Sequence, residues 1–237
     1  MCQSMFCAIP SPWQGWNEKA RDMLLVFLPV VGLEIGLLWT GLGYLFRFLG
    51  LPVLIAGALL AAYPYLVTGF IHLDGFMDVT DAVKSWRDLE RRREILKDSH
   101  VGSFSVIGCI LLMIAQFAVF SSLPGDTNLW MLTLIPVVSR CCSALAVSML
   151  PPMNTSQYAG VKKHTGNIVT LFIMLTAALA VGFLIGKQSG FCLLGCIAGH
   201  GLALLRAYRS LKGMNGDISG FCLTISELTA AAVLVFV

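Results

Sequence analysis

The chain has 237 residues, of which 57% are hydrophobic and 12% are charged, with a formal net charge of +3. The hydrophobic share exceeds that of a typical soluble domain, and apolar runs recur up to Val237, so the composition indicates an integral membrane protein. A signal peptide followed by a soluble domain is excluded, and no nucleic-acid partner is expected.

Seven apolar stretches are long enough to be predicted as membrane-spanning helices, within a range of six to eight. Their expected bounds are about 23–45, 53–71, 101–123, 129–150, 168–186, 190–208 and 221–237. The last stretch is short enough to be partly re-entrant. Because no internal repeat is evident, a transporter built from inverted halves is disfavoured. The predicted fold is an all-α polytopic helical bundle that forms a single domain over residues 1–237.

Polar residues at and between these spans also carry structural expectations. Residues 1–22 contain Trp13 and Trp16 and are expected at the membrane interface. The polar stretch 74–100 is expected to form a helix on the membrane surface. Glu34 and Arg140 fall inside predicted spans, where an ion costs about 2.5–3.5 kcal/mol, so each should face other helices or a polar partner. The cysteines of the apolar segments are expected to act as small packing residues.

The basic residues are distributed unevenly over the predicted loops. Thirteen of the sixteen lysines and arginines lie in or beside the N-terminal segment and the loops after spans two, four and six. The opposite loops hold only Arg47 and Lys187. The positive-inside rule then places the N-terminus and these basic loops in the cytoplasm, so the polar clusters share one cytoplasmic face. The expected location is the inner (cytoplasmic) membrane of the cell.

The stretch His72–Asp81 reads His-Leu-Asp-Gly-Phe-Met-Asp-Val-Thr-Asp and follows the second apolar run directly. In a helix, Asp74, Asp78 and Asp81 stand at i, i+4 and i+7 and therefore on one stripe. Like charges this close repel, and a divalent cation held by oxygen ligands would make the arrangement favourable. The alternative is an ordinary solvated helix face, which is the usual meaning of such spacing in soluble proteins.

Aspartates beside lysines and arginines on one face supply the groups that transfer of a phosphate group requires. A metal neutralises the charge of a pyrophosphate and orients the attacking hydroxyl, while basic side chains hold phosphate oxygens. The chain has no Walker-type glycine loop, so nucleotide hydrolysis by that route is not expected.

The run from His72 to Ala82 resembles the signature of the cobalamin synthase, or adenosylcobinamide-GDP ribazoletransferase, family. Other segments agree with the pattern of that family in chain order: 9–10, 27–32, 91–104, Ser139-Arg140, Asn215-Gly216-Asp217 with Gly220, and Glu227. The resemblance therefore covers essentially the whole chain. Two positions depart from the pattern, because His100 and Ser105 stand where arginine and glycine are expected.

The resemblance implies a Mg²⁺-dependent reaction. Adenosylcobinamide-GDP is joined to alpha-ribazole or its 5'-phosphate, which releases GMP and forms adenosylcobalamin or its phosphate. Asp74, Asp78 and Asp81 are then expected to organise the metal and the pyrophosphate, with one of them accepting the hydroxyl proton. Asp217 is expected as a further metal ligand. The residues expected to bind substrate are Lys97, Asp98, Arg140, Lys163 and Asn215.

Several roles stay open at this point. His72 points away from Asp74 on a helix, which favours a structural role. Arg140 is either a phosphate clamp or a buried ion braced by Glu227 and Glu34, and bracing is favoured. A CDP-alcohol-type phosphotransferase and, outside enzymes, a cation transporter are the alternative functions. The lipid bilayer is an expected partner, and association into a homo-oligomer is left open.

Overall fold

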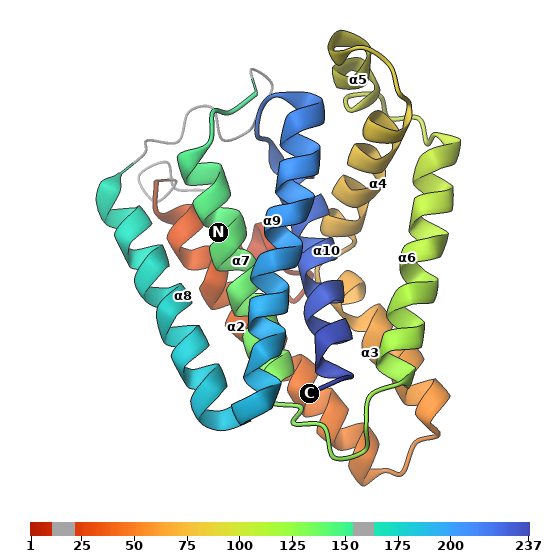
Figure 1. The fold of residues 1–237 in the computed structure, drawn as a ribbon, viewed down its shortest axis with the longest axis vertical. Helices are drawn as coiled ribbons and strands as arrows, with labels where there is room; N and C mark the ends of the chain where they lie inside the picture. Colours follow the sequence, from red (N-terminus) through yellow and green to blue (C-terminus); the bar gives the residue numbers. More distant parts are fainter. Residues whose placement is uncertain (11–21, 154–163) are drawn as a thin grey trace.

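The computed structural model describes residues 1–10, 22–153 and 164–237, and the described chain is helical (Figure 1). Of the predicted interfacial segment 1–22, residues 11–21, which include Trp13 and Trp16, lie outside the described residues. The helices are α1 (Cys2–Phe6), α2 (Leu24–Phe48), α3 (Val53–Val67), α4 (Ile71–Lys84), α5 (Leu89–Ile95), α6 (Ser103–Ser121), α7 (Met131–Met149), α8 (Thr165–Gly186), α9 (Phe191–Leu211) and α10 (Gly216–Leu234), with the 3-10 turn η2 (Lys187–Gly190) between α8 and α9.

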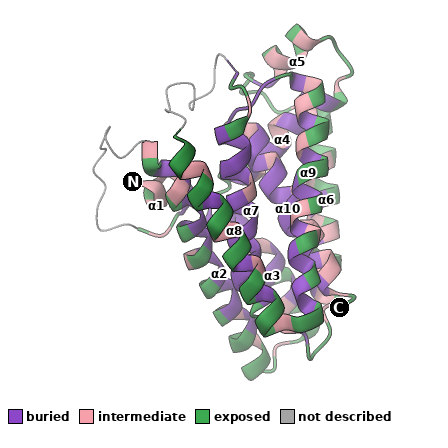
Figure 2. Cartoon of the chain, turned by 60° about the vertical axis from the view of Figure 1, so that its left-hand side comes forward, coloured by how far each residue is buried: buried purple, intermediate pink, exposed green. Residues whose placement is uncertain are grey.

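Helix α7 forms the centre of the bundle and is almost entirely buried, whereas α6 and α8 expose apolar faces (Figure 2). Small residues let α2 approach α7 closely. A Cβ atom added to Gly32 would lie 2.9 Å from the carbonyl carbon of Pro136, and one added to Gly36 would lie 2.7 Å from Cα of Thr133. Close backbone approach at small residues is typical of helix packing in membranes.

Helices α6 and α8 lie at the outside of the bundle, and their exposed apolar faces are assigned to contact with lipid.

The number of membrane crossings agrees with the predicted range. Among the described residues, five helical stretches are long and apolar enough to span, or six when the bent pair α3–α4 is counted as one span. One of the five is the 47-residue stretch Thr165–Leu211, which contains α8 and α9. Figure 1 shows these two helices running in opposite directions from η2, so dividing the stretch at this turn gives seven.

The second predicted span differs from expectation, because it bends at its C-terminal end. Helix α3 ends at Val67, and α4 begins at Ile71 after a turn of 90°. Gly69 and Phe70 take left-handed conformations at φ +61° and +64°, which ends α3 and redirects the chain. The hydroxyl of Thr68 donates to the carbonyl of Pro64 at 2.7 Å and satisfies a group that the break leaves free.

The polar stretch 74–100 was expected as one surface helix, and this prediction was wrong for its first part. It contains two helices: α4, which packs against α6 and α10 with one face buried, and the short, solvent-exposed α5. The charged residues of α5 agree with a surface position. Helix α4, in contrast, is buried on one side. Gly75 is at its close contact with α10, and Gly108 of α6 is at its close contact with α6.

The loops and junctions that connect the helices gather at two opposite ends of the bundle (Figure 1). The C-terminal end of α4, all of α5, the start of α6 and the junction between α9 and α10 lie together at one end. The junctions α2–α3, α6–α7 and α8–α9 lie at the other end with the C-terminus. This arrangement brings the predicted polar elements to a common end.

Candidate active site

Helix α4 carries the acidic stripe on the predicted register. Residues 71–84 are helical, so Asp74, Asp78 and Asp81 share one side of the helix. The opposite side is buried and includes Val79 and Ala82. Asp74 is exposed, and Asp78 and Asp81 are half-buried. The three aspartates therefore lie on the less buried side of α4.

The N-terminus of α10 supplies the second part of the site. The side chain of Asn215 accepts a hydrogen bond from the backbone N–H of Ile218 at 3.0 Å and so caps the helix. Its amide nitrogen donates to Oδ2 of Asp217 at 2.6 Å. Asp217 thus lies in the first turn, where the positive end of the helix dipole favours a carboxylate.

Two glycines allow α10 to approach α4. A Cβ atom at Gly75 would lie 2.8 Å from the carbonyl oxygen and 2.9 Å from Cα of Asp217. A Cβ atom at Gly220 would lie 3.1 Å from the carbonyl oxygen of His72. The hydroxyl of Thr224 donates to that same carbonyl at 3.3 Å. This close crossing of α4 and α10 places Asp217 beside α4, although the two segments are more than a hundred residues apart in the chain.

We expect Gly75→Ala to destabilise the protein by about 1–3 kcal/mol, the usual cost of overpacking, and to lower turnover. The added methyl group would press on backbone atoms of Asp217 and push the two helices apart. Thermal unfolding in detergent and product release measure the two effects.

The matched control is Gly41→Ala in α2, where a Cβ atom meets nothing within 4 Å. Alanine is the better helix former, so this change should be neutral or stabilising by up to about 1 kcal/mol. Equal losses of stability and turnover in Gly75→Ala and Gly41→Ala would contradict the inference that Gly75 is needed for the close approach of α4 and α10.

Asp78 is the centre of the negative charge. Its carboxylate interacts electrostatically with those of Asp74, Asp217 and Asp81. None of the ion pairs found among the described residues includes any of these four aspartates. In the same part of the chain, no three acidic, histidine or cysteine side chains converge closely enough to form a metal cage. The repulsion at Asp78 would be relieved by a cation that shares its ligands with substrate or water.

A polar cleft adjoins the C-terminal end of the stripe. It lies between the end of α4, α5 and the start of α6, with an empty volume of about 1030 Å³, open solvent included. Asp81 lines it, and a Cβ atom at Gly102 would collide with that carboxylate. The cleft also contains Arg87 and Arg91, whose guanidinium groups suit phosphate oxygens. From the sequence alone, both arginines belong to a charged surface helix, and their spacing does not indicate a cleft.

Lys97 and Asp98 lie in the exposed loop between α5 and α6, at the same end as the cleft. The backbone N–H of His100 donates to Oδ1 of Asp98 at 3.0 Å, and Nδ1 of His100 lies 2.6 Å from the same oxygen. These contacts hold the pKa of Asp98 below its usual value, so it is an anion at neutral pH. Asp98 would repel a phosphate unless a cation lay between them.

The expectation that Arg140 holds a substrate phosphate does not fit its position. Its side chain is 1% exposed, and Nη1 lies 2.9 Å from Oε1 of Glu227. Ser139 donates to the same carboxylate oxygen at 2.9 Å. Glu34, the other proposed brace, instead accepts a hydrogen bond from Gln3 at 2.9 Å. Arg140 is thus a buried ion paired with Glu227, which was the favoured alternative.

Two further expectations concern Lys163 and His72. Lys163 lies outside the described residues. His72 is buried and its ring stacks on that of Phe6, with centroids 6.5 Å apart. Its side chain therefore lies away from the acidic stripe, as the helical register predicted.

Comparisons with known proteins identify the family of the chain. A family model described as cobalamin-5-phosphate synthase matches residues 1–235. A protein of Clostridium perfringens strain 13 named adenosylcobinamide-GDP ribazoletransferase is 36% identical over 239 residues, which cover 99% of this chain and 95% of that protein. Proteins of the same name from Clostridium botulinum strain Alaska E43 and Brevibacillus brevis strain 47 are 34% and 32% identical, over 96% and 98% of this chain and 92% and 95% of their own. No solved structure matches the chain.

Proposed function

The chain belongs to the cobalamin-5-phosphate synthase family, and from that membership we propose that it completes the nucleotide loop of cobalamin at a membrane. It transfers the adenosylcobinamide phosphate moiety of adenosylcobinamide-GDP to alpha-ribazole or alpha-ribazole 5'-phosphate. A ribose hydroxyl oxygen forms the new bond to the corrinoid-side phosphorus. The bond from that phosphorus to the bridging oxygen breaks, and GMP leaves with this oxygen.

One observation carries the proposal beyond family membership. The acidic stripe of α4 meets Asp217 from the start of α10, with Asn215 beside it. A concentration of negative charge without a counter-ion among the described residues suits a site that works on a pyrophosphate through a cation. A lipid-headgroup transferase or a cation transporter has no comparable support from the family match.

The donor set fits Mg²⁺. It consists of carboxylate oxygens from Asp74, Asp78, Asp81 and Asp217, the hard ligands that this ion prefers. Mg²⁺ is commonly held by one or two carboxylates together with waters and substrate phosphates, so a closed protein cage is not required. A bound Mg²⁺ would neutralise charge on the pyrophosphate and favour the departure of GMP.

The protein's own groups divide the remaining work. One of the three α4 aspartates accepts the proton of the attacking hydroxyl. Asn215 keeps Asp217 oriented through the hydrogen bond between their side chains. Lys97 and Lys163 are the cationic groups that we propose for substrate phosphates, and Arg87 and Arg91 add two donors at the cleft. Asp98 contributes only in contact with a cation or a hydroxyl donor.

The site is proposed to face the cytoplasm from the inner membrane. The basic loops that accompany α5 and the α9–α10 junction support this orientation. Water-soluble alpha-ribazole and GMP would then enter and leave on the same side, while the helices remain in lipid. Self-association into a homo-oligomer is compatible with this arrangement and is not required by it.

The proposal predicts that purified protein releases GMP only when Mg²⁺, adenosylcobinamide-GDP and alpha-ribazole 5'-phosphate are all present. Chromatography of the products measures this, and removal of Mg²⁺ with EDTA should stop the reaction reversibly. A CDP-alcohol with a lipid alcohol serves as the control substrate pair. Folded protein that releases no GMP, or that releases CMP from the control pair, would contradict the proposal.

A further inference from the structure

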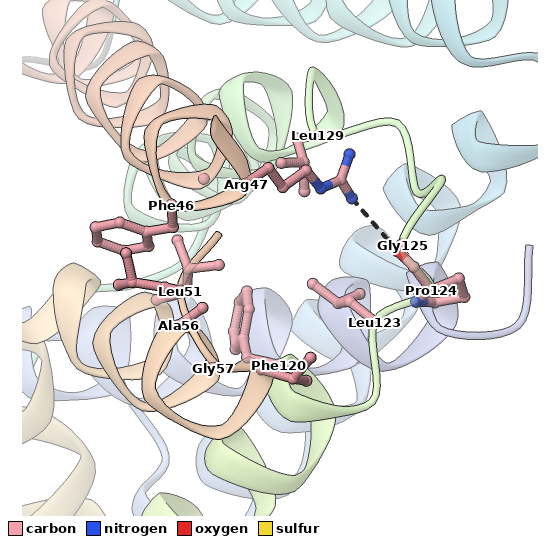
Figure 3. Close-up of a pocket in the computed structure, with 13 residues that line it drawn as sticks. Phe46, Arg47, Leu51, Ala56, Gly57, Phe120, Leu123, Pro124, Gly125 and Leu129 are labelled. Atoms are coloured by element: carbon pink, nitrogen blue, oxygen red, sulfur yellow. Dashed lines mark hydrogen bonds between the residues drawn. The ribbon is translucent and has the colours of Figure 1, made fainter. Parts of the chain in front are cut away.

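A second pocket lies at the end of the bundle opposite the acidic helix, between the α2–α3 and α6–α7 junctions. Its empty volume is about 540 Å³, open solvent included. Most of its lining is apolar, including Phe46, Leu51, Ala56, Leu60, Phe120 and Leu123. Figure 3 shows Phe46, Leu51, Ala56, Phe120 and Leu123 around the hollow, with Arg47 reaching across to Pro124. The apolar lining suits a hydrocarbon chain rather than a polar metabolite.

Arg47 gives the pocket one strongly polar group. Its Nη2 donates to the carbonyl of Pro124 at 3.3 Å across the mouth of the pocket (Figure 3). None of the ion pairs among the described residues includes Arg47. Arginine has five N–H donors, so one contact with a neutral carbonyl leaves donors and a full positive charge for an anion.

Two aromatic residues indicate the depth of this site in the bilayer. The rings of Tyr44 and Trp130 lie 6.2 Å apart, and the two residues are 39% and 48% exposed. The guanidinium carbon of Arg47 lies 5.9 Å from the centre of the Tyr44 ring. Exposed tyrosine and tryptophan at helix ends are typical of the level of lipid headgroups. Arg47 is therefore at phosphate depth, and the apolar pocket extends from it toward acyl chains.

We propose that this pocket binds one glycerophospholipid of the leaflet opposite the active site. The lipid phosphate pairs with the guanidinium of Arg47, and part of one acyl chain enters the apolar hollow. Charge complementarity and the match in depth favour a phospholipid over an apolar peptide, which has no anion for Arg47. The test below distinguishes a phospholipid from a second copy of the chain. The inference does not depend on the proposed transferase reaction.

The test is titration of delipidated protein in detergent with dioleoylphosphatidylglycerol, followed by native mass spectrometry. Wild type should bind one lipid that survives activation in the gas phase. Arg47→Gln should bind it about tenfold more weakly, the effect of losing one charge-assisted hydrogen bond. Ala56→Trp, which fills the hollow, should weaken binding similarly. Dioleoylglycerol, which lacks the phosphate, should bind wild type and Arg47→Gln equally.

The matched control is Lys187→Gln, because Lys187 is the other basic residue of the loops at this end of the bundle. It should bind the phospholipid like wild type. Thermal unfolding checks that each variant is folded. The proposal is overturned if Arg47→Gln retains wild-type affinity, or if Lys187→Gln loses as much. A dimer that excludes the lipid would assign the pocket to a second copy and also overturn it.

Discussion

Asp78→Asn is expected to lower the rate of GMP release by about 10³-fold or more. The change keeps the size of the side chain and one oxygen but removes the charge at the centre of the acidic stripe. Charge stabilisation by a metal site amounts to several kcal/mol, and each 1.36 kcal/mol corresponds to a factor of ten. Single-turnover assays at saturating substrate and Mg²⁺ measure the loss. Asp74→Asn and Asp81→Asn are each expected to abolish turnover as well.

The same variant should behave in the opposite way in stability measurements. Without Mg²⁺, Asp78 repels three neighbouring carboxylates, so neutralising it should leave the midpoint of thermal unfolding unchanged or raise it. The control is Asp126→Asn, in the exposed turn at the far end of the bundle, which should leave rate and stability unchanged. An Asp78→Asn protein with wild-type turnover would rule out a metal role for this residue.

Glu227→Gln is expected to destabilise the protein by about 3–5 kcal/mol, the cost of leaving one charge of a buried pair uncompensated. The guanidinium of Arg140 contacts one carboxylate oxygen of Glu227 at 2.9 Å and the carbonyl of Pro136 at 3.3 Å. Without the carboxylate, the positive charge remains deep in the bundle with neutral partners only. Unfolding in mixed micelles with increasing sodium dodecyl sulfate measures the free energy.

A double variant separates pairing from packing. Arg140→Met with Glu227→Leu removes both charges, so it should be more stable than Glu227→Gln alone. Glu34→Gln is the matched control, since this half-buried carboxylate contacts the neutral amide of Gln3, which can still bond to a glutamine. If Glu227→Gln and Glu34→Gln cost the same, the buried pair has no special role in stability.

Much of the site was foreseeable because its signals are local. The i, i+4 and i+7 spacing of Asp74, Asp78 and Asp81 predicted one stripe, and α4 has that register. The capping residue Asn215 and the following Asp217 also belong to a single local motif. The signature around His72 and the later motifs pointed to the family that the comparisons establish.

Other parts of the site depend on contacts that no local pattern reports. The 90° bend after α3 depends on two consecutive left-handed residues, of which Phe70 is not one that favours this conformation. The cleft that contains Arg87 and Arg91 forms only when α5 folds beside the start of α6. Read along the sequence, both arginines belong to an ordinary charged helix.

By itself, the sequence determined the helical membrane class, the common end of the basic loops and the acidic stripe, because helical periodicity and loop charge act over short distances. The family resemblance suggested Asp217 as a partner of the stripe and left two roles open for Arg140. Only the tertiary structure decided that Asp217 lies beside α4 and that Arg140 pairs with Glu227. These contacts join distant helices, and they depend on where small residues such as Gly75 and Gly32 let backbones approach. The sequence contains those glycines but does not say which helix each one meets.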